Sequence, residues 1–160
     1  SQINKLKELA PPNSKKVHWR DMGVNKQRSA LQIVAEIPQS TYVVIAAPIK
    51  PNRQERARRK CLEVLLPYLE SDNVEVLTLE SRGDFLDKKD IDFLFYLRRA
   101  GIVSSIDVTH ATGTADLCLS VPDQILGAYG ELLANTSVAP KWLEVWKRIA
   151  ERITTMRVTP

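Results

Sequence analysis

At 160 residues, the chain is long enough for one compact domain and too short for a second independent hydrophobic core. Hydrophobic residues make up 44% of it and charged residues 26%, which is typical of ordinary soluble globular proteins. No apolar run approaches the roughly 18 residues that span a bilayer, and the first residues lack the hydrophobic region of a signal peptide. We therefore expect a cytoplasmic protein that does not enter a membrane.

The first predicted elements follow a polar N-terminal segment. Residues 1–16 are basic and contain two consecutive prolines, so we expect a loosely attached segment before a single α/β domain over 17–160. Apolar residues at i, i+3, i+4 and i+7 predict a helix over 25–37. The nearly continuous apolar run over 41–47 predicts a strand that is covered on both faces.

A helix and a strand are predicted next. The helix spans 54–70, and Pro67 is expected to kink it or to end it early. Alternating side chains predict a strand over 74–80 that ends on Glu80. Because α/β proteins place their chemistry at the carboxyl edge of the sheet, Glu80 is a candidate site residue. An ion pair with Arg82 is the alternative role for this carboxylate.

The second half of the chain continues the alternation. Asp87 and Asp90 are predicted to form a capping pair for a helix over 88–100, and Asp84 is predicted to lie in the preceding turn. The remaining predictions are a strand over 105–109 and helices over 123–133 and 142–153. This order predicts an α/β fold in which neighbouring strands are parallel and crossovers are right-handed.

The cysteines and histidines do not indicate a metal site. Cys61 and Cys118 lie in apolar patterns without a partner at ligand spacing, so we expect two buried free thiols. His18 and His110 are too few, and too far apart in the sequence, to suggest zinc by themselves.

Residues 53–60 form a basic octet with five cations and one anion, a net charge that equals the +4 of the whole chain. Its cations are Arg53, Arg56, Arg58, Arg59 and Lys60. Two interpretations are open: a surface that contacts nucleic-acid phosphates, or a solvated helix face. A basic cluster at the start of a helix is unfavourable against the helix dipole, which favours the functional interpretation.

Acidic residues are the remaining candidates for chemistry, because the chain contains no phosphate-binding glycine loop and no GxSxG, HExxH or CxxC motif. The candidates are Glu80, Asp107, Asp116 and Asp123. Carboxylates gathered at one sheet edge suit Mg²⁺ or Mn²⁺, and two such ions can support phosphodiester hydrolysis. For Asp123, a structural role as an acid at a helix start is the alternative.

Two of the tryptophans fall on one apolar stripe. Trp142 and Trp146 share a face of the last predicted helix, which indicates packing in the core, on a protein partner or on a second copy of the chain. Trp19 lies in an irregular polar stretch and is predicted to be a buried anchor for the N-terminal segment.

Four segments of the sequence resemble a bacterial family that is catalogued as domain of unknown function 3800 and is regarded as ribonuclease H-like. They are residues 53–62, 77–82, 87–90 and 121–128. The Leu-Glu-Ser-Arg and Pro-Asp-x-x-x-Gly-Ala elements contribute most of the resemblance, which spans about residues 18–129. It implies a ribonuclease H-like mixed or parallel sheet flanked by helices. The implied core covers about 41–135, with a C-terminal helix over about 141–155.

The resemblance also implies site residues and a function. Glu80 matches the family's fourth-strand acid and Asp123 its helix acid, both as ligands of Mg²⁺ or Mn²⁺, with Asp107 or Asp116 as helpers. Such a domain is a metal-dependent nuclease or a nucleic-acid-binding protein, and residues 53–60 would contact phosphates. The family's opening strand with an Asp-Glu-Ser-Gly motif has no counterpart in this chain. The alternative is therefore a catalytically inactive interaction module that keeps the fold.

Overall fold

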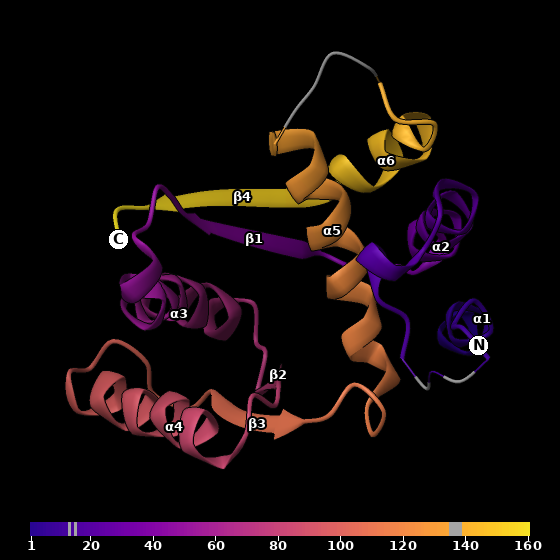
Figure 1. Cartoon of the computed structure of the whole chain (residues 1–160). Helices are drawn as coiled ribbons and strands as arrows, with labels where there is room; N and C mark the ends of the chain where they lie inside the picture. Colours follow the sequence, from indigo (N-terminus) through magenta and orange to yellow (C-terminus); the bar gives the residue numbers. More distant parts are fainter. Residues whose placement is uncertain (13, 15, 135–138) are drawn as a thin grey trace. The chain divides into compact units, whose positions relative to one another are not determined.

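The computed structural model describes residues 1–12, 14, 16–134 and 139–160 of the chain (Figure 1). The helices are α1 (Gln2–Lys7), α2 (Val24–Glu36), α3 (Gln54–Ser71), α4 (Asp84–Arg99), α5 (Ser120–Ala134) and α6 (Leu143–Ala150). The strands are β1 (Thr41–Ala46), β2 (Val76–Glu80), β3 (Asp107–Ala111) and β4 (Ile153–Val158). Short 3₁₀ helices lie at Trp19–Asp21 (η1), Pro51–Arg53 (η2) and Leu117–Leu119 (η3). The predicted α/β class is confirmed.

The elements form two compact units, each with buried hydrophobic residues of its own, where the length of the chain suggests a single core. Unit 1 comprises Ser1–Thr41 and Gly113–Ile153, and unit 2 comprises Tyr42–Thr112 and Thr154–Pro160. No helix within the described residues is long and apolar enough to cross a bilayer. Residue 135, at the predicted end of the core, lies outside the described residues.

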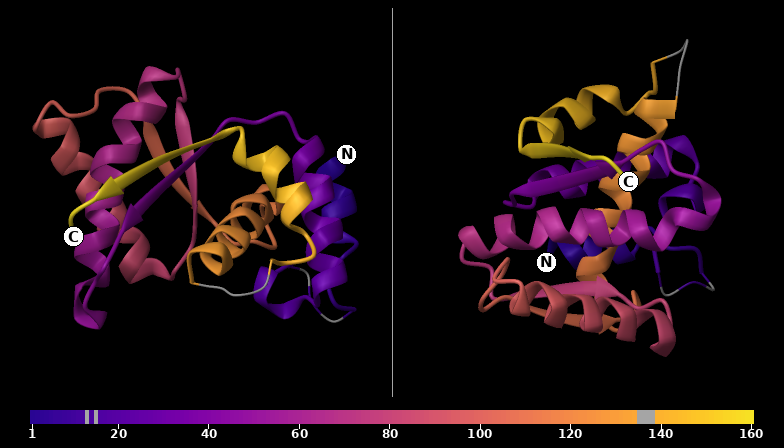
Figure 2. Two further views of the ribbon diagram at one scale, coloured as in Figure 1. Left: turned by 90° about the horizontal axis from the view of Figure 1, so that it is seen from above. Right: turned by 90° about the vertical axis from the view of Figure 1, so that its left-hand side faces the viewer.

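The described strands form two small parallel sheets in place of the one sheet that the sequence suggests. β1 lies beside β4, and the two run in the same direction (Figure 2). β2 pairs with β3 in a register that places Val76 opposite Asp107 and Glu80 opposite Ala111. The carboxyl ends of β2 and β3 therefore lie together, as the parallel prediction requires.

The C-terminal part of the chain differs from the prediction. α6 ends at Ala150. It is therefore shorter than the helix predicted over 142–153 and shorter than the helix over about 141–155 that the resemblance implies. The chain then turns and continues as β4, whose residues Ile153, Thr154, Thr155 and Val158 are β-branched. Such side chains lose rotamer freedom in a helix and pack well on a sheet, so the segment pairs with β1.

Two helix boundaries also correct the sequence reading. α3 continues through Pro67 to Ser71 and does not end early. The tertiary packing of buried Leu62 and Leu66 before the proline, and of partly buried Leu69 after it, outweighs one lost backbone hydrogen bond. α4 begins at Asp84, so this residue is helical rather than part of a turn. Gly83, with φ at +95°, makes the sharp entry into α4.

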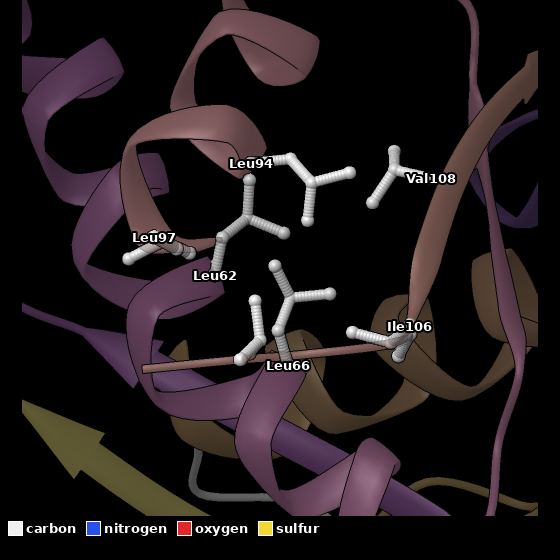
Figure 3. Packing of buried hydrophobic residues seen from close by; sticks show 7 residues of the cluster. Leu62, Leu66, Leu94, Leu97, Ile106 and Val108 are labelled. Atoms are coloured by element: carbon white, nitrogen blue, oxygen red, sulfur yellow. The ribbon is translucent and has the colours of Figure 1, made fainter. Parts of the chain in front are cut away.

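The core of unit 2 lies between α3, α4 and the β2–β3 pair (Figure 3). Its buried aliphatic side chains come from α3, α4, the α4–β3 connection and β3: Leu62, Leu66, Leu94, Leu97, Val103, Ile106 and Val108. Leu77 and Leu79 of β2 are partly buried against them. The leucines of α3 and α4 recur at helical spacing, so each helix turns one apolar stripe toward the other elements. α3 also contacts β1, where Cys61 approaches the Val44 carbonyl. The outward side of α4 is exposed and includes Phe95 and Tyr96.

The core of unit 1 contains a cluster of aromatic rings among aliphatic side chains. The rings of Trp19 and Trp142 meet edge to face with centroids 5.3 Å apart, and Trp142 meets Trp146 at 6.5 Å. Trp142 and Trp146 are only 1% and 5% exposed, so the structure supports the core interpretation and not contact with a partner. In place of a loosely attached segment, residues 2–7 form α1, whose Leu6 is fully buried beside α2.

Glu70, near the end of α3, holds the chain that enters β3. Its carboxylate accepts backbone hydrogen bonds from Ser104, Ser105 and Ile106 at 3.0, 2.6 and 2.9 Å. These bonds, that from Ile106 first among them, lower the pKa of Glu70 from 4.5 to about 2. A carboxyl group whose pKa falls on folding stabilises the protein while it is ionised.

We expect this contribution to be complete above pH 4.5 and to be lost as the pH falls toward about 2. Glu70→Gln should therefore be less stable than the native protein above pH 4.5, and the two should converge within that window. Urea unfolding followed by far-UV circular dichroism at several pH values measures this, with the exposed Glu75→Gln as the control. A difference that stays constant down to the lowest pH contradicts the assignment.

Candidate functional site

The two predicted acids of unit 2 lie at opposite ends of the same sheet. Glu80 is the last residue of β2 and is exposed, whereas Asp107 is the first residue of β3 and lies opposite Val76. Asp107 and Glu80 therefore lie four residues apart along the strand direction, which is about 13 Å. Asp107 is 3.4 Å from an Arg98 guanidinium nitrogen. The structure therefore does not bring Glu80 and Asp107 into one site.

The two predicted acids of unit 1 both bind backbone groups. Asp116 caps η3 by accepting a hydrogen bond of 2.9 Å from the Cys118 amide. Asp123 lies in the first turn of α5 and accepts a hydrogen bond of 2.9 Å from the Trp19 amide. Its second carboxylate oxygen is 3.8 Å from His18 Nδ1. These contacts support the structural alternative for Asp123.

One face of α5 is built to hold Trp19. Asp123, Gly127 and Glu131 follow each other at intervals of four residues, and Glu131 accepts a hydrogen bond of 2.6 Å from the indole nitrogen. A Cβ atom at Gly127 would lie 2.1 Å from Cγ of Trp19, so only glycine lets the ring pack this close. The predicted anchor role of Trp19, which is 5% exposed, is confirmed. The Pro-Asp-x-x-x-Gly-Ala element thus has a packing explanation.

The described residues do not fit the predicted metal site. Within them, no three histidine, cysteine, aspartate or glutamate side chains gather as metal ligands. The two main predicted ligands belong to different units, Glu80 to unit 2 and Asp123 to unit 1. Asp123 is bonded to the Trp19 amide. Mg²⁺ and Mn²⁺ are usually bound by several oxygen ligands. We therefore assign no step to a bound metal ion.

The structure gathers a different polar cluster in unit 2, beyond the carboxyl ends of β2 and β3. Its centre is Asp90, which is 5% exposed and lies inside α4 rather than at its cap. Arg58 of α3 binds both carboxylate oxygens, through Nε at 3.0 Å and Nη2 at 2.9 Å. Arg82 lies 3.3 Å away, and His110 Nε2 is 3.1 Å from Asp90 Oδ2.

Two further carboxylates complete this cluster. Glu55 of α3 pairs with Arg82, which therefore links α3 to α4. Asp87 accepts hydrogen bonds from the Ser81 hydroxyl at 2.5 Å and from the Arg82 amide at 2.8 Å. Asp87 thus holds the loop before α4, which is close to its predicted capping role.

The cluster is balanced electrostatically. Burial opposes ionisation of Asp90, but hydrogen bonds from Arg58 and His110 and the charges of both arginines outweigh it and lower the pKa of Asp90. The hydrogen bond to Glu55 raises the pKa of Arg82. Bidentate pairing of this kind holds both partners rigidly. We interpret the cluster as the clamp that sets α3 against α4.

The clamp divides the basic octet into two groups. Arg58 faces inward and pairs with Asp90, so this residue of the predicted nucleic-acid-binding set is committed to the clamp. Arg53, Arg56 and Arg59 are exposed, and Lys60 is half-buried and pairs with Glu63 at 3.0 Å. Because consecutive helical residues point about 100° apart, burying Arg58 turns its neighbours Arg56 and Arg59 toward solvent.

The exposed cations line two adjoining grooves of unit 2. The first, here called the Arg157 groove, has a volume of about 570 Å³ and is lined by residues of the β1–α3 connection and the end of β4. Its charged side chains are Lys50, Arg53, Arg56 and Arg157, and no Asp or Glu lines it. The second, here called the Tyr96 groove, lies between α3 and α4 and has a volume of about 680 Å³. Arg56 lines both grooves.

The sequence did not predict the Asp90 cluster. Of the cations in the Arg157 groove, it predicted Arg53 and Arg56 but not Lys50 or Arg157. His110 and Ser81-Arg82 stand at the carboxyl ends of two predicted parallel strands, and that position was the available signal. The thiols also differ from expectation: Cys61 is half-buried and Cys118 is exposed, although both are free.

Comparison with known proteins adds no assignment, because no family model, curated protein or solved structure significantly matches the chain. The resemblance to the ribonuclease H-like family stays a hypothesis.

Proposed function

We propose that the protein binds nucleic acid, and that the Arg157 groove contacts its phosphates. The observation that supports this most directly is the charge of the groove: four cations and no acidic side chain. Phosphate contacts by lysine and arginine supply most of the affinity of non-specific nucleic-acid binding. The ribonuclease H-like resemblance implies the same class of ligand.

These cations are available to a ligand. Lys50, Arg53, Arg56 and Arg157 are all exposed. In the part of the chain that the structure describes, none of them makes an ion pair or a side-chain hydrogen bond. Like charges gathered without a counter-ion repel each other, and a bound phosphate relieves that repulsion. The proposal does not include strand cleavage, because no ligand group for a catalytic metal is assembled in the described residues.

A salt titration tests the proposal. We expect fluorescence anisotropy with a labelled oligonucleotide to show binding that weakens as salt is added. The triple variant Arg53→Gln, Arg56→Gln, Arg157→Gln should bind about tenfold more weakly or worse. Its plot of log affinity against log salt should be shallower by about 2 to 3, since each phosphate contact contributes about 0.7 on a single strand and about 0.9 on a duplex.

The control removes the same charge elsewhere. Arg20, Arg28 and Arg148 are exposed residues of unit 1, and changing all three to glutamine also lowers the net charge by three. We expect this variant to keep most of the salt slope. If both triple variants lost affinity and salt slope equally, the loss would follow from the change in net charge alone, and the proposed surface would be contradicted.

A further inference from the structure

The Tyr96 groove combines cations with an exposed aromatic face. α3 contributes Arg56, Arg59 and Lys60 to its lining, and α4 contributes Lys89, Phe93 and Tyr96. The groove adjoins the Arg157 groove through Arg56, so a chain of phosphates bound in one can continue into the other. All of these residues belong to unit 2.

Two arginines of the Tyr96 groove make no ion pair, among the described residues, with the acids that line it. The groove also contains four acids, but each of them pairs within the chain. Glu55 pairs with Arg82, Glu63 with Lys60, Asp90 with Arg58 and Asp92 with Lys88. Within the described residues, Arg56 and Arg59 have no such partner. The lining holds as many acids as cations, but the acids are neutralised by partners within the chain, so Arg56 and Arg59 stay available to an incoming ligand.

Tyr96 presents a supported ring at this groove. Its side chain is 52% exposed, and its ring stacks on Phe93 with centroids 5.7 Å apart and planes inclined by 15°. Phe93 packs against the hydrophobic core of unit 2. Because the Tyr96 ring already packs on Phe93, a ligand that stacks on it restricts its motion little further. Aromatic faces held beside cationic grooves are the usual platforms for stacking unpaired bases.

We propose that the Tyr96 groove binds single-stranded nucleic acid, with phosphates on Arg56 and Arg59 and one base stacked on Tyr96. This inference rests on the proposed function and adds the class of nucleic acid that is bound. In a duplex the bases stack on each other and their faces are not available to a protein ring. An unpaired strand offers both features that the groove complements, a negative backbone and free base faces.

A comparison of strands and variants tests the inference. Labelled single-stranded DNA, single-stranded RNA and a duplex hairpin of matched length are titrated with the full chain. We expect the single strands to bind more tightly than the hairpin. Tyr96→Leu should weaken single-strand binding about tenfold, in line with the loss of one base stack. Tyr96→Phe, which keeps the aromatic face, should retain the affinity.

Two matched controls separate the groove from the rest of α4. Phe95 is also 52% exposed but does not line the groove, so Phe95→Leu should leave single-strand binding unchanged. Arg59→Gln should weaken binding, whereas Arg99→Gln, an exposed cation outside the groove, should not. Equal affinity for single strands and hairpin, or equal effects of Tyr96→Leu and Phe95→Leu, overturns this inference but leaves the proposed function standing. No binding to any of the three probes overturns the proposed function itself.

Discussion

Replacing Gly127 with alanine is expected to lower the free energy of unfolding by about 2 kcal/mol. The new Cβ would meet Trp19 at Cγ, Cδ1 and Cβ, at 2.1, 2.4 and 2.5 Å, so the ring or the helix must move. Overpacking of this kind costs about 3 kcal/mol, and the better helix propensity of alanine returns about 1. Trp19 cannot shift freely, because its amide and indole nitrogens are bonded to Asp123 and Glu131.

Gly130 supplies a control in the same helix. It lies three residues further along α5, and nothing lies within 4 Å of a Cβ built on it. Gly130→Ala should therefore raise the free energy of unfolding by about 1 kcal/mol or less. All three tryptophans of the chain lie in unit 1, so tryptophan fluorescence during urea unfolding reports on this unit. Equal effects of the two substitutions would show that the Trp19 contact adds nothing.

Replacing Asp90 with alanine is expected to cost about 3 kcal/mol of unfolding free energy. The change leaves the two guanidinium groups of Arg58 and Arg82 without their shared carboxylate, and these side chains are only 29% and 26% exposed. Removing one partner of a buried pair is far more costly than losing a surface ion pair. Because the pKa of Asp90 is lowered below 3.8, its contribution is present above that pH and disappears as the pH falls further.

Asp92 is the matched control for this prediction. It lies two residues away on α4, is 59% exposed and pairs with Lys88, so Asp92→Ala should cost less than about 0.5 kcal/mol. Far-UV circular dichroism during urea unfolding measures both variants. If the clamp sets α3 against α4, Asp90→Ala should also weaken nucleic-acid binding. Asp92→Ala removes an acid from the lining of the Tyr96 groove without disturbing the clamp, so it should not weaken binding. A loss of stability at Asp90 no larger than that at Asp92 would contradict the clamp.

Local patterns predicted most elements within a few residues. The strand expected over 41–47 is β1, and the helices expected over 25–37 and 123–133 are α2 and α5. Periodic burial and turn residues act over short stretches of chain, so they can be read without knowing what packs where. The reading failed where tertiary contacts outweigh propensity: Pro67 is kept within α3 by its buried leucines, and Ile153 begins a strand because β1 lies beside it.

The sequence by itself determined the class of fold, the parallel β2–β3 pair and the concentration of positive charge in residues 53–60. Only the tertiary structure decided what individual charges do. Arg58 and Asp90 are 32 positions apart, and Asp123 and Trp19 are 104 positions apart, so no local pattern reveals either pair. A charge that finds a buried partner becomes part of the fold, and a charge that finds none stays available to a ligand. That difference separates Arg58 from Arg56 and Arg59, although all three lie within one turn of a helix.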